Sequence, residues 1–349
     1  MGTTPERHIV FMGSPDFAVP SLDALAASRR YCPALVVSQP DRPRGRGRRT
    51  APTAVRRRAL DLDLPTLEMS RANYATVVAE LAALAPEIVV VVAFGIIVRR
   101  DLLDLPARGC INVHASLLPM YRGVSPVQAA LLAGDTVTGC TTMRMDEGID
   151  TGDVYLRREM LIDPDDTAGS LTDRLSRLGA DLLLETLDAM FAGEITPEPQ
   201  GESPTPYARR VRKSDGEIDW TLDAPVLERR VRAMTPWPSA FTHCRGGRVI
   251  VTRARVAPDL EGSSEPGGRH AGTSDSGRTG TREINAAGPE GIAAWRPGRV
   301  VSTSPLRIAC GRGALDIERL KPEGAREMTA AEYLAGHLVS AGDDFSFAG

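Results

Sequence analysis

The first half of the chain alternates continuous apolar runs with stretches of helical periodicity. The apolar runs predict strands at residues 8–13, 34–38, 88–94, 110–115 and 141–145. The periodic stretches predict helices at residues 20–27, 74–84, 128–132 and 167–193. Strands that are apolar on both faces and separated by helices are typical of a mainly parallel sheet covered on both sides. The sequence therefore predicts an α/β domain over residues 1–194.

The pattern changes after residue 194. Residues 195–206 contain four prolines and few apolar residues, which favours an inter-domain linker. The rest of the chain, residues 207–349, shows one helical stretch and several short apolar runs, at residues 224–234, 240–244, 248–256, 298–301 and 306–310. These predict a small, mostly β, barrel-like domain. Within it, fourteen of the thirty-one residues 261–291 are Gly, Ser or Pro, which predicts a disordered surface insertion.

The overall charge is nearly balanced, with 42 basic and 45 acidic side chains among 349 residues. Residues 42–58 depart from this balance, because they hold eight arginines and no acidic residue. The five cysteines are widely spaced without a CxxC pair, which is typical of reduced thiols and indicates no zinc site. The longest apolar run, residues 88–98, is too short to span a bilayer. We therefore expect a cytoplasmic protein with no membrane partner and no metal.

The predicted strand at residues 110–115 carries Asn112 and His114. Residues i and i+2 of a strand face the same side, about 6.7 Å apart. Ligands of open α/β sheets bind at the carboxyl ends of strands, where this pair is expected to lie. Both side chains can donate a hydrogen bond to a carbonyl oxygen that becomes negative during nucleophilic addition. The alternative is a buried polar pair that the backbone satisfies.

A second polar cluster, DEGIDTGD, occupies residues 146–153 and follows a predicted strand. It does not fit a calcium-binding EF-hand, because Arg157 stands where the bidentate carboxylate would be needed. Asp150 could orient His114 and favour its protonated form, or the cluster could be a solvated turn. Neither a G-x-S-x-G elbow nor a dinucleotide-binding glycine fingerprint is present.

The arginine-rich residues 42–49 contain Pro43, Gly45 and Gly47, which exclude a helix and predict a loop. Arginines on a loop bind phosphates well, so nucleic acid is one interpretation and a solvated loop is the other.

Several motifs together resemble a known family. The sequences NVHASLLPMYRGVSPVQAAL and TGCTTMRMDEGIDTGD resemble the formyltetrahydrofolate-dependent formyltransferases. The sequences FMGSPDFAVPSLDAL, SQPDRPRGRGRR, VVAFGIIV, DGEIDW and LDIERLKPEGAREMTAAEYL are similar to the members of that family that act on methionyl-tRNA. The resemblance runs from about His8 to Phe345 and is interrupted at residues 261–291.

The resemblance implies a Rossmann-like formyltransferase domain followed by a C-terminal OB-like β-barrel. It implies transfer of a formyl group from 10-formyltetrahydrofolate to the amino group of methionyl-initiator-tRNA for translation initiation. Asn112 and His114 would stabilise the oxyanion, and Asp150 would hold His114 and assist the proton shift through water. A monomer without a metal is expected.

The resemblance also implies the binding residues. The folate pocket would be lined by two turns, comprising Ser116, Leu117, Leu118 and Pro119 and then Phe94, Gly95, Ile96 and Ile97. The tRNA acceptor end would contact the arginine loop, at Arg42, Arg44, Arg46, Arg48 and Arg49, and the second domain would bind the flank of the tRNA. The chain departs from the family at residues 96–98, where a proline is usual, and at Met120, where Arg or Lys is common.

Three alternatives stay open at this point. One is a formyltransferase that acts on a small amine such as a ribonucleotide or an amino sugar, which would need the same three residues. The arginine loop and the second domain favour tRNA over that alternative. The others are a formyl-folate hydrolase and a non-catalytic RNA-binding protein, and the presence of Asn112, His114 and Asp150 argues against the latter.

Overall fold

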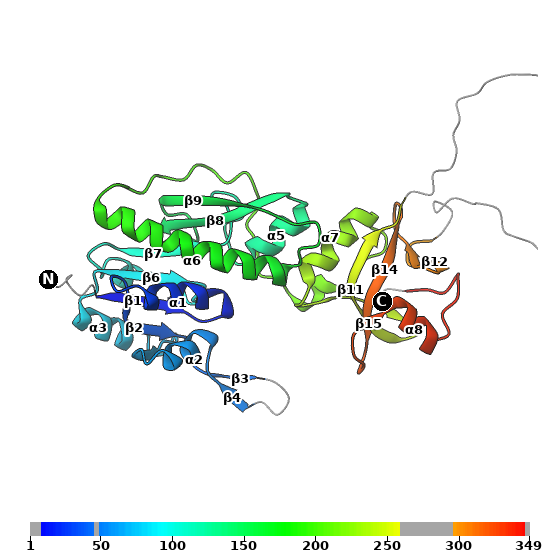
Figure 1. The fold of residues 1–349 in the computed structure, drawn as a ribbon, viewed down its shortest axis with the longest axis horizontal. Coiled ribbons are helices and arrows are strands. Elements are labelled where there is room, and N and C mark those ends of the chain that lie inside the picture. The colour runs from blue at the N-terminus through cyan, green and yellow to red at the C-terminus, as the bar shows by residue number, and fades with distance from the viewer. Residues whose placement is uncertain (1–7, 45–48, 259–295, 346–349) are drawn as a thin grey trace, which may run out of the picture. The chain divides into compact units, whose positions relative to one another are not determined.

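The computed structural model describes residues 8–44, 49–258 and 296–345 (Figure 1). The chain forms two compact units, residues 1–211 and 212–349, which are treated separately below. The predicted insertion, residues 261–291, lies outside the described residues. Within the described ranges, no helix is both long and apolar enough to cross a membrane.

The first unit is built on a seven-stranded sheet with the order β5-β2-β1-β6-β7-β8-β9. Its strands are β1 (Ile9–Gly13), β2 (Pro33–Ser38), β5 (Thr66–Glu68), β6 (Ile88–Val92), β7 (Cys110–His114), β8 (Val137–Arg144) and β9 (Val154–Leu161). The strands from β5 to β7 run parallel, whereas β8 is antiparallel to β7 and β9 is antiparallel to β8. The predicted mainly parallel sheet is therefore confirmed.

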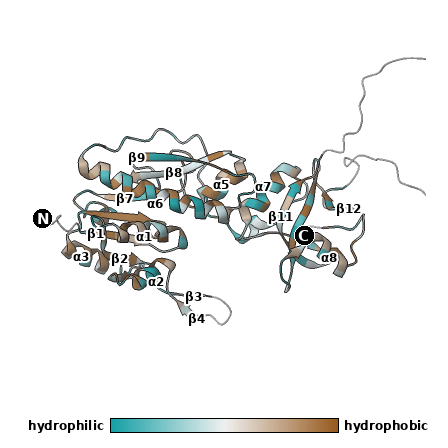
Figure 2. Cartoon of the chain, viewed as in Figure 1, coloured by the Kyte–Doolittle hydropathy of each residue, from teal (hydrophilic) through white to brown (hydrophobic). Residues whose placement is uncertain are grey.

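Helices cover both faces of this sheet. They are η1 (Asp16–Ala18), α1 (Val19–Ala27), α2 (Ala54–Asp61), α3 (Tyr74–Leu84), α4 (Arg100–Leu103), α5 (Pro126–Ala133) and α6 (Ala168–Ala192). Ile9 and Phe11 belong to an apolar cluster that also contains residues of α1, α2 and α6. Val10 and Met12 belong to a second cluster, with residues of α3 and α4. Alternate residues of β1 are thus buried on opposite faces, which explains its continuous apolar run (Figure 2).

Helix α6 begins and ends close to the predicted bounds of 167–193. Its N-cap is Thr167, whose hydroxyl accepts a hydrogen bond from the Ser170 N–H. The Ser170 hydroxyl in turn accepts a hydrogen bond from the Thr167 N–H. Its C-cap is Gly193, which has φ = +75°. Glycine takes this left-handed conformation without the steric penalty of a side chain. The helix is therefore fixed at both ends by local sequence.

The arginine-rich segment differs from its prediction as a loop. Its described ends form two short antiparallel strands, β3 (Arg42–Arg44) and β4 (Arg49–Ala51), which pair only with each other among the described strands. A two-stranded ribbon tolerates Pro43, because each strand has an outer edge where no ladder partner needs an N–H donor. The exclusion of a helix is confirmed for the described residues 42–44 and 49, and residues 45–48 lie outside the described residues.

The segment predicted as a linker, residues 195–206, hydrogen-bonds to the first unit. Glu198 and Val154 exchange two backbone hydrogen bonds of 2.8 Å each. The two compact units divide between Val211 and Arg212, so residues 195–206 belong to the first unit. The further contacts of residues 195–206 lie at the candidate site.

The second unit contains an antiparallel sheet with the order β10-β11-β14-β13-β12, and β15 pairs with β14. Its elements are η2 (Lys213–Gly216), α7 (Ala224–Met234), β10 (Ala240–Cys244), β11 (Gly247–Val256), β12 (Val300–Thr303), β13 (Leu306–Ala309), β14 (Ala314–Pro322), β15 (Met328–Thr329) and α8 (Ala330–Gly336). Inside it, Trp220 Nε1 donates to Thr242 Oγ1 at 3.0 Å. The prediction of a mostly β second domain is confirmed.

Candidate active site

Strand β7 places Asn112 and His114 on one face of the sheet. Ile111 and Val113, which alternate with them, belong to the apolar cluster shared with α6. Asn112 and His114 therefore point to the opposite face, because side chains alternate along a strand. His114 is the last residue of β7 and is only 6% exposed.

Both nitrogens of the His114 ring face an oxygen atom. Nε2 lies 3.0 Å from the backbone oxygen of Tyr121. Nδ1 lies 3.6 Å from Asp150 Oδ1, slightly beyond direct hydrogen-bond distance. A neutral imidazole can donate to only one of these acceptors, whereas a ring protonated on both nitrogens can donate to both. The structure thus brings His114 and Asp150 together and surrounds the ring with acceptors.

Asp150 lies in the loop between β8 and β9. This loop leaves β8 beside the amino end of β7, where the Met145 N–H donates to the Cys110 oxygen at 2.8 Å. Asp150 has φ = +56°, and its Oδ2 accepts a 2.9 Å hydrogen bond from the Gly123 N–H. A non-glycine residue in the left-handed region needs surrounding contacts to hold it. The Asp150 carboxylate therefore bridges the Gly123 turn and the His114 ring.

The rest of the acidic cluster closes its own turn. Asp146 Oδ1 accepts hydrogen bonds from the Gly148 N–H at 3.0 Å and from the Thr151 hydroxyl at 2.8 Å. The interpretation as a polar turn thus applies to Asp146, whereas Asp150 lies beside His114 and its orienting role stays a prediction. Within the described ranges, no three His, Cys, Asp or Glu side chains lie close enough to hold a metal ion.

The turn after β7, residues 116–119, is firmly held next to His114. The Ser116 hydroxyl donates to the Met120 oxygen at 2.6 Å. Thr141 on β8 donates its hydroxyl to the Ser116 oxygen and accepts from the Leu118 N–H, at 2.7 Å and 3.0 Å. The Leu118 side chain is buried, and Arg157 Nε donates to its carbonyl at 2.6 Å. Any ligand at this turn would meet a fixed backbone.

The second turn predicted to bind folate follows β6, the strand that pairs with β7. The Phe94 oxygen accepts hydrogen bonds from Gln39 Nε2 at 2.7 Å and from the Ser14 hydroxyl at 3.2 Å. Phe94 is buried, whereas Ile97 is 68% exposed. A cavity of about 270 Å³ adjoins the turn and is lined by Ser14, Pro15, Gln39, Ala51, Pro52, Thr53, Ala54, Ala93, Phe94 and Gly95.

The predicted tRNA-binding arginines begin beside this cavity. Arg42 and Arg44 are on β3, and Arg49 is on β4, which ends at a cavity-lining residue, Ala51. Arg46 and Arg48 lie outside the described residues. At the base of this hairpin, Arg56 of α2 donates to Asp41 at 2.7 Å and also pairs with Glu68. The hydrogen bond to the Asp41 carboxylate raises the pKa of Arg56 above its ordinary value.

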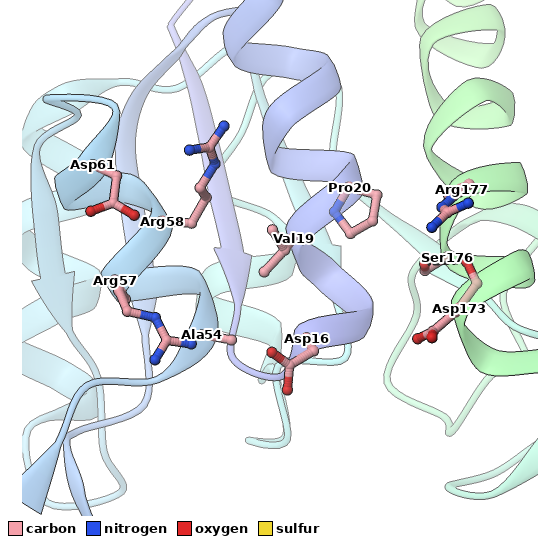
Figure 3. A pocket seen from close by; sticks show the side chains of 10 residues that line it. All are labelled: Asp16, Val19, Pro20, Ala54, Arg57, Arg58, Asp61, Asp173, Ser176 and Arg177. Carbon is pink, nitrogen blue, oxygen red and sulfur yellow. Dashed lines mark hydrogen bonds between the residues drawn. The ribbon is translucent and has the colours of Figure 1, made fainter. Parts of the chain in front are cut away.

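A larger cavity of about 430 Å³ lies elsewhere in the first unit (Figure 3). Figure 3 shows Asp16 in η1, just before α1, Arg57 on α2, and Asp173 with Arg177 on α6. Three aspartates and three arginines line it, so their charges balance. None of its lining residues comes from β7 or from the turns around His114, and it shows no preference for an anionic ligand.

Three side chains of the site are not predicted from the sequence: Arg122, Gln200 and Tyr207. Arg122 lies in the turn at residues 121–123. Gln200 and Tyr207 lie in residues 198–208, which we call the strap. Gln200 Nε2 donates to the backbone oxygens of Asp150 and Gly152, at 3.1 Å and 2.6 Å. Gln200 Oε1 accepts from Arg122 Nε and Nη2, at 3.1 Å and 2.9 Å. The strap is rich in proline and polar residues, as a linker is. Its composition therefore does not predict these contacts.

The third is Tyr207, which lies against Gly123. A Cβ atom on Gly123 would stand 2.8 Å from Tyr207 Cζ, so only glycine leaves room for this ring. Tyr207 is 49% exposed. Burial raises the pKa of its phenol, and the charge of Asp150 adds to the increase. An exposed aromatic ring thus lies beside the Asp150 carboxylate.

The chain matches two family models that together span most of its length. One, described as formyl transferase, covers residues 6–187. The other, described as the C-terminal domain of formyl transferase, covers residues 210–338. The first match lies within the first compact unit, and almost all of the second match lies within the second unit.

Individual relatives agree with these matches. The chain is 42% identical to the methionyl-tRNA formyltransferase of Geotalea daltonii, with 96% of this chain and 97% of the relative covered. It is 45% identical to the methionyl-tRNA formyltransferase of Halorhodospira halophila, with 96% and 98% covered. Its fold is similar to HypX from Aquifex aeolicus in complex with tetrahydrofolic acid, with a TM-score of 0.57, 16% identity, and 97% of this chain but 48% of HypX covered. The chain belongs to the formyl transferase family.

Proposed function

We propose that this chain transfers the formyl group of 10-formyltetrahydrofolate to the amino group of methionyl-initiator-tRNA. The product would be N-formylmethionyl-tRNA for translation initiation. The observation that carries this proposal is the 42–45% identity to methionyl-tRNA formyltransferases over nearly the whole length of both chains, second domain included. A transferase for small amines would not require that the second domain match as well.

In the proposed reaction, the amine attacks the formyl carbon and the bond from that carbon to N10 breaks. Asn112 and His114 would donate hydrogen bonds to the formyl oxygen while it carries negative charge. Fixed donors in a buried site stabilise such a charge strongly, because they need no reorganisation during the step. The burial of His114 supports this role. To donate to the formyl oxygen, His114 Nε2 would exchange its present partner, the Tyr121 oxygen, for that oxygen.

Asp150 would hold His114 and assist the proton transfer. The attacking amine loses one proton and N10 gains one, so the reaction consumes no net acid or base. The Asp150 carboxylate lies 3.6 Å from His114 Nδ1 and is 15% exposed, which supports a water-assisted transfer at this point.

The binding residues follow the same proposal. The folate would bind along residues 116–119 and residues 94–97, where the backbone is held by hydrogen bonds from Thr141, Arg157 and Gln39. The arginines of the β3–β4 hairpin would bind phosphates at the acceptor end of the tRNA, and the second unit would bind its flank. Arginine suits phosphate because its fork of donors matches the phosphate oxygens.

A monomer in the cytoplasm fits these assignments. The five cysteines are free thiols, as in reducing compartments. Light scattering of the purified protein would test the monomer.

One assay tests the function. Consumption of 10-formyltetrahydrofolate is followed with and without methionyl-initiator-tRNA, and with uncharged tRNA as the control. We expect consumption only with the charged tRNA, together with formylated methionine after the ester is hydrolysed. Equal consumption without any tRNA would instead indicate a formyl-folate hydrolase. Formylation of an amino sugar or aminonucleotide in place of methionyl-tRNA would contradict the proposal.

A further inference from the structure

Gln200 connects the two backbone segments that hold the His114 ring. One segment is the turn that carries the Tyr121 oxygen, 3.0 Å from His114 Nε2. The other is the loop that carries Asp150, whose carboxylate is 3.6 Å from His114 Nδ1. The distance between these two segments therefore determines how far each of the two acceptor oxygens lies from the His114 ring.

The Gln200 amide spans this distance with all of its hydrogen-bonding groups. Its oxygen accepts two hydrogen bonds from Arg122, which follows Tyr121 directly. Its nitrogen donates two, to the carbonyls of Asp150 and Gly152. An amide has one oxygen and two N–H groups, so this arrangement uses it fully. Only a side chain with an acceptor at one corner and two donors at the other can join an arginine to two carbonyls.

The strap that carries Gln200 is itself fixed on the same turn. The Thr205 hydroxyl accepts a 2.7 Å hydrogen bond from the Tyr121 N–H. Ala208 donates its N–H to the Arg122 oxygen at 2.8 Å, and its own oxygen accepts from the Val124 N–H at 2.7 Å. Gln200 thus projects from a segment that is anchored to the turn and reaches across to the Asp150 loop.

The Asp150 loop needs this support. Asp150 has φ = +56°, a conformation that costs a non-glycine residue on the order of 1–3 kcal/mol and persists only where neighbouring groups hold it. The Asp150 carbonyl, one of the two that Gln200 binds, belongs to that strained residue. Removing the amide would leave two partly buried carbonyls without their donor and would release the loop.

We infer that Gln200 is a positioning residue for formyl transfer, which holds Asp150 at its distance from His114. The inference rests on the roles proposed above for Asp150 and His114. Displacing a catalytic group by about 1 Å costs up to ~10²-fold in rate. We therefore expect Gln200→Leu, which keeps the size of the side chain and removes its hydrogen bonds, to lower kcat by about 10- to 100-fold. The KM for each substrate should change by less than about threefold, because Gln200 contacts neither binding turn.

The experiment measures single-turnover formylation of methionyl-tRNA by the full chain in four forms: wild type, Gln200→Leu, Asp150→Asn and the double variant. Two groups that act as a unit give losses that do not add. We expect the double variant to be no more than about twofold slower than Asp150→Asn alone. Glu202→Leu is the matched control, since Glu202 is an exposed residue of the same strap, and its rate should equal that of wild type.

A second variant, Gln200→Glu, tests the donor role without a change of shape. Its carboxylate can still accept from Arg122, but it presents an oxygen without hydrogen to the two carbonyls. The ordinary pKa of a glutamate is about 4.3 and the Arg122 guanidinium favours its charged form, so the side chain lacks a donor at neutral pH. We therefore expect Gln200→Glu to lower kcat by about 10- to 100-fold, as Gln200→Leu does. A role in filling space alone would leave the rate of Gln200→Glu close to that of wild type, because the two side chains have the same size and shape.

Three results would overturn the inference: a wild-type rate for Gln200→Leu, fully multiplicative losses in the double variant, or a wild-type rate for Gln200→Glu. A failure of the role proposed for Asp150 is seen separately, because Asp150→Asn alone would then keep the wild-type rate. If Gln200→Leu does not fold by circular dichroism, the double-variant comparison is made with Gln200→Glu at pH 8.

Discussion

The surroundings of His114 and the β3–β4 hairpin differ in how many parts of the chain hold them. His114 ends strand β7 and faces the Tyr121 turn and the Asp150 loop, and hydrogen bonds join that loop to the turn and to the strap. The hairpin strands pair with each other and project beyond α2 (Figure 1). At the base of the hairpin, Arg56 of α2 donates a hydrogen bond to Asp41.

This difference matches two physical tasks. Bond formation requires reacting groups placed within a fraction of an ångström, which demands a rigid and buried setting. Binding a polyanion depends on the number of charges near the phosphates and tolerates a less exact placement. The comparison therefore predicts that changes near His114 affect rate, whereas changes in the hairpin affect tRNA binding and its response to salt.

The largest expected effect is at the candidate catalytic residues. We expect His114→Ala, Asp150→Asn and Asn112→Ala each to lower turnover by ~10²–10³-fold, as when a donor to an oxyanion is lost. Folate affinity should fall much less, because the two turns proposed to bind folate are intact. Single-turnover formylation, with circular dichroism to check folding, decides the matter. A residue whose replacement leaves turnover near normal has no catalytic role.

Gly123→Ala should have the next largest effect. Gly123 has φ = +122°, and a Cβ atom there would lie 2.6 Å from the Ala208 oxygen. We expect a loss of roughly 1–3 kcal/mol in the free energy of unfolding, from backbone strain and overpacking, and slower turnover because the Gly123 N–H holds Asp150. Thermal unfolding and single-turnover rates measure the two effects.

The matched control for this change is Gly201→Ala. A Cβ atom on Gly201 would meet nothing within 4 Å, so stability and turnover should both stay close to wild type. Equal melting temperatures for the two variants would show that the turn at Gly123 can relax, and the site would then be less rigid than the comparison requires.

Replacing hairpin arginines should have a smaller effect, of a different kind. Each phosphate contact contributes about 0.7–0.9 to the slope of log affinity against log salt. Arg46→Ala should therefore weaken tRNA binding and flatten that slope, and Arg42→Ala with Arg44→Ala should flatten it further. The KM for 10-formyltetrahydrofolate should not change. Titration of methionyl-tRNA at several salt concentrations measures this, and identical slopes would leave the hairpin without a role in binding phosphates.

Deleting residues 261–291 should have the smallest effect. The segment contains one large aliphatic residue, Ile284, and so has little to bury. Loop-closure entropy changes slowly with loop length, so we expect less than about 1 kcal/mol of change in the free energy of unfolding. Differential scanning calorimetry of the deleted and full chains compares them. A large fall in melting temperature would mean that the segment packs against the rest of the protein.

Strong local patterns predict much of the fold. The continuous apolar run of β6 and the periodic stretches of α3 and α7 are found within two residues of their predicted ends. Strands β9 and β14 are not predicted, because charged residues alternate with apolar ones in them, as in YLRREML and LDIERLK. Such half-buried strands give a short pattern that resembles a polar loop. Pairing with β8 and β11 decides their conformation, and that information is not local.

The candidate site also contains some residues that the sequence predicts and others that it does not. Asn112, His114 and Asp150 are predicted because their types and spacing resemble a family, and the structure brings His114 and Asp150 within 3.6 Å. Gln200 and Tyr207 are not predicted, because their importance depends on contacts with residues 50 to 84 positions away. Leu118 is predicted to line the folate pocket; its buried side chain packs with Met143 and Val154, and its contact with folate stays a prediction.

The strap also bears on how the catalytic half could be cut out of this chain or transplanted into another scaffold. A fragment that ends at residue 194, after the last long helix, would contain Asn112, His114 and Asp150 but would lack Gln200, Thr205 and Ala208. It would also expose the Val154 edge that Glu198 covers with two backbone hydrogen bonds. An excised domain that keeps its reactive geometry must therefore extend to Val211, seventeen residues beyond the apparent end of the α/β pattern.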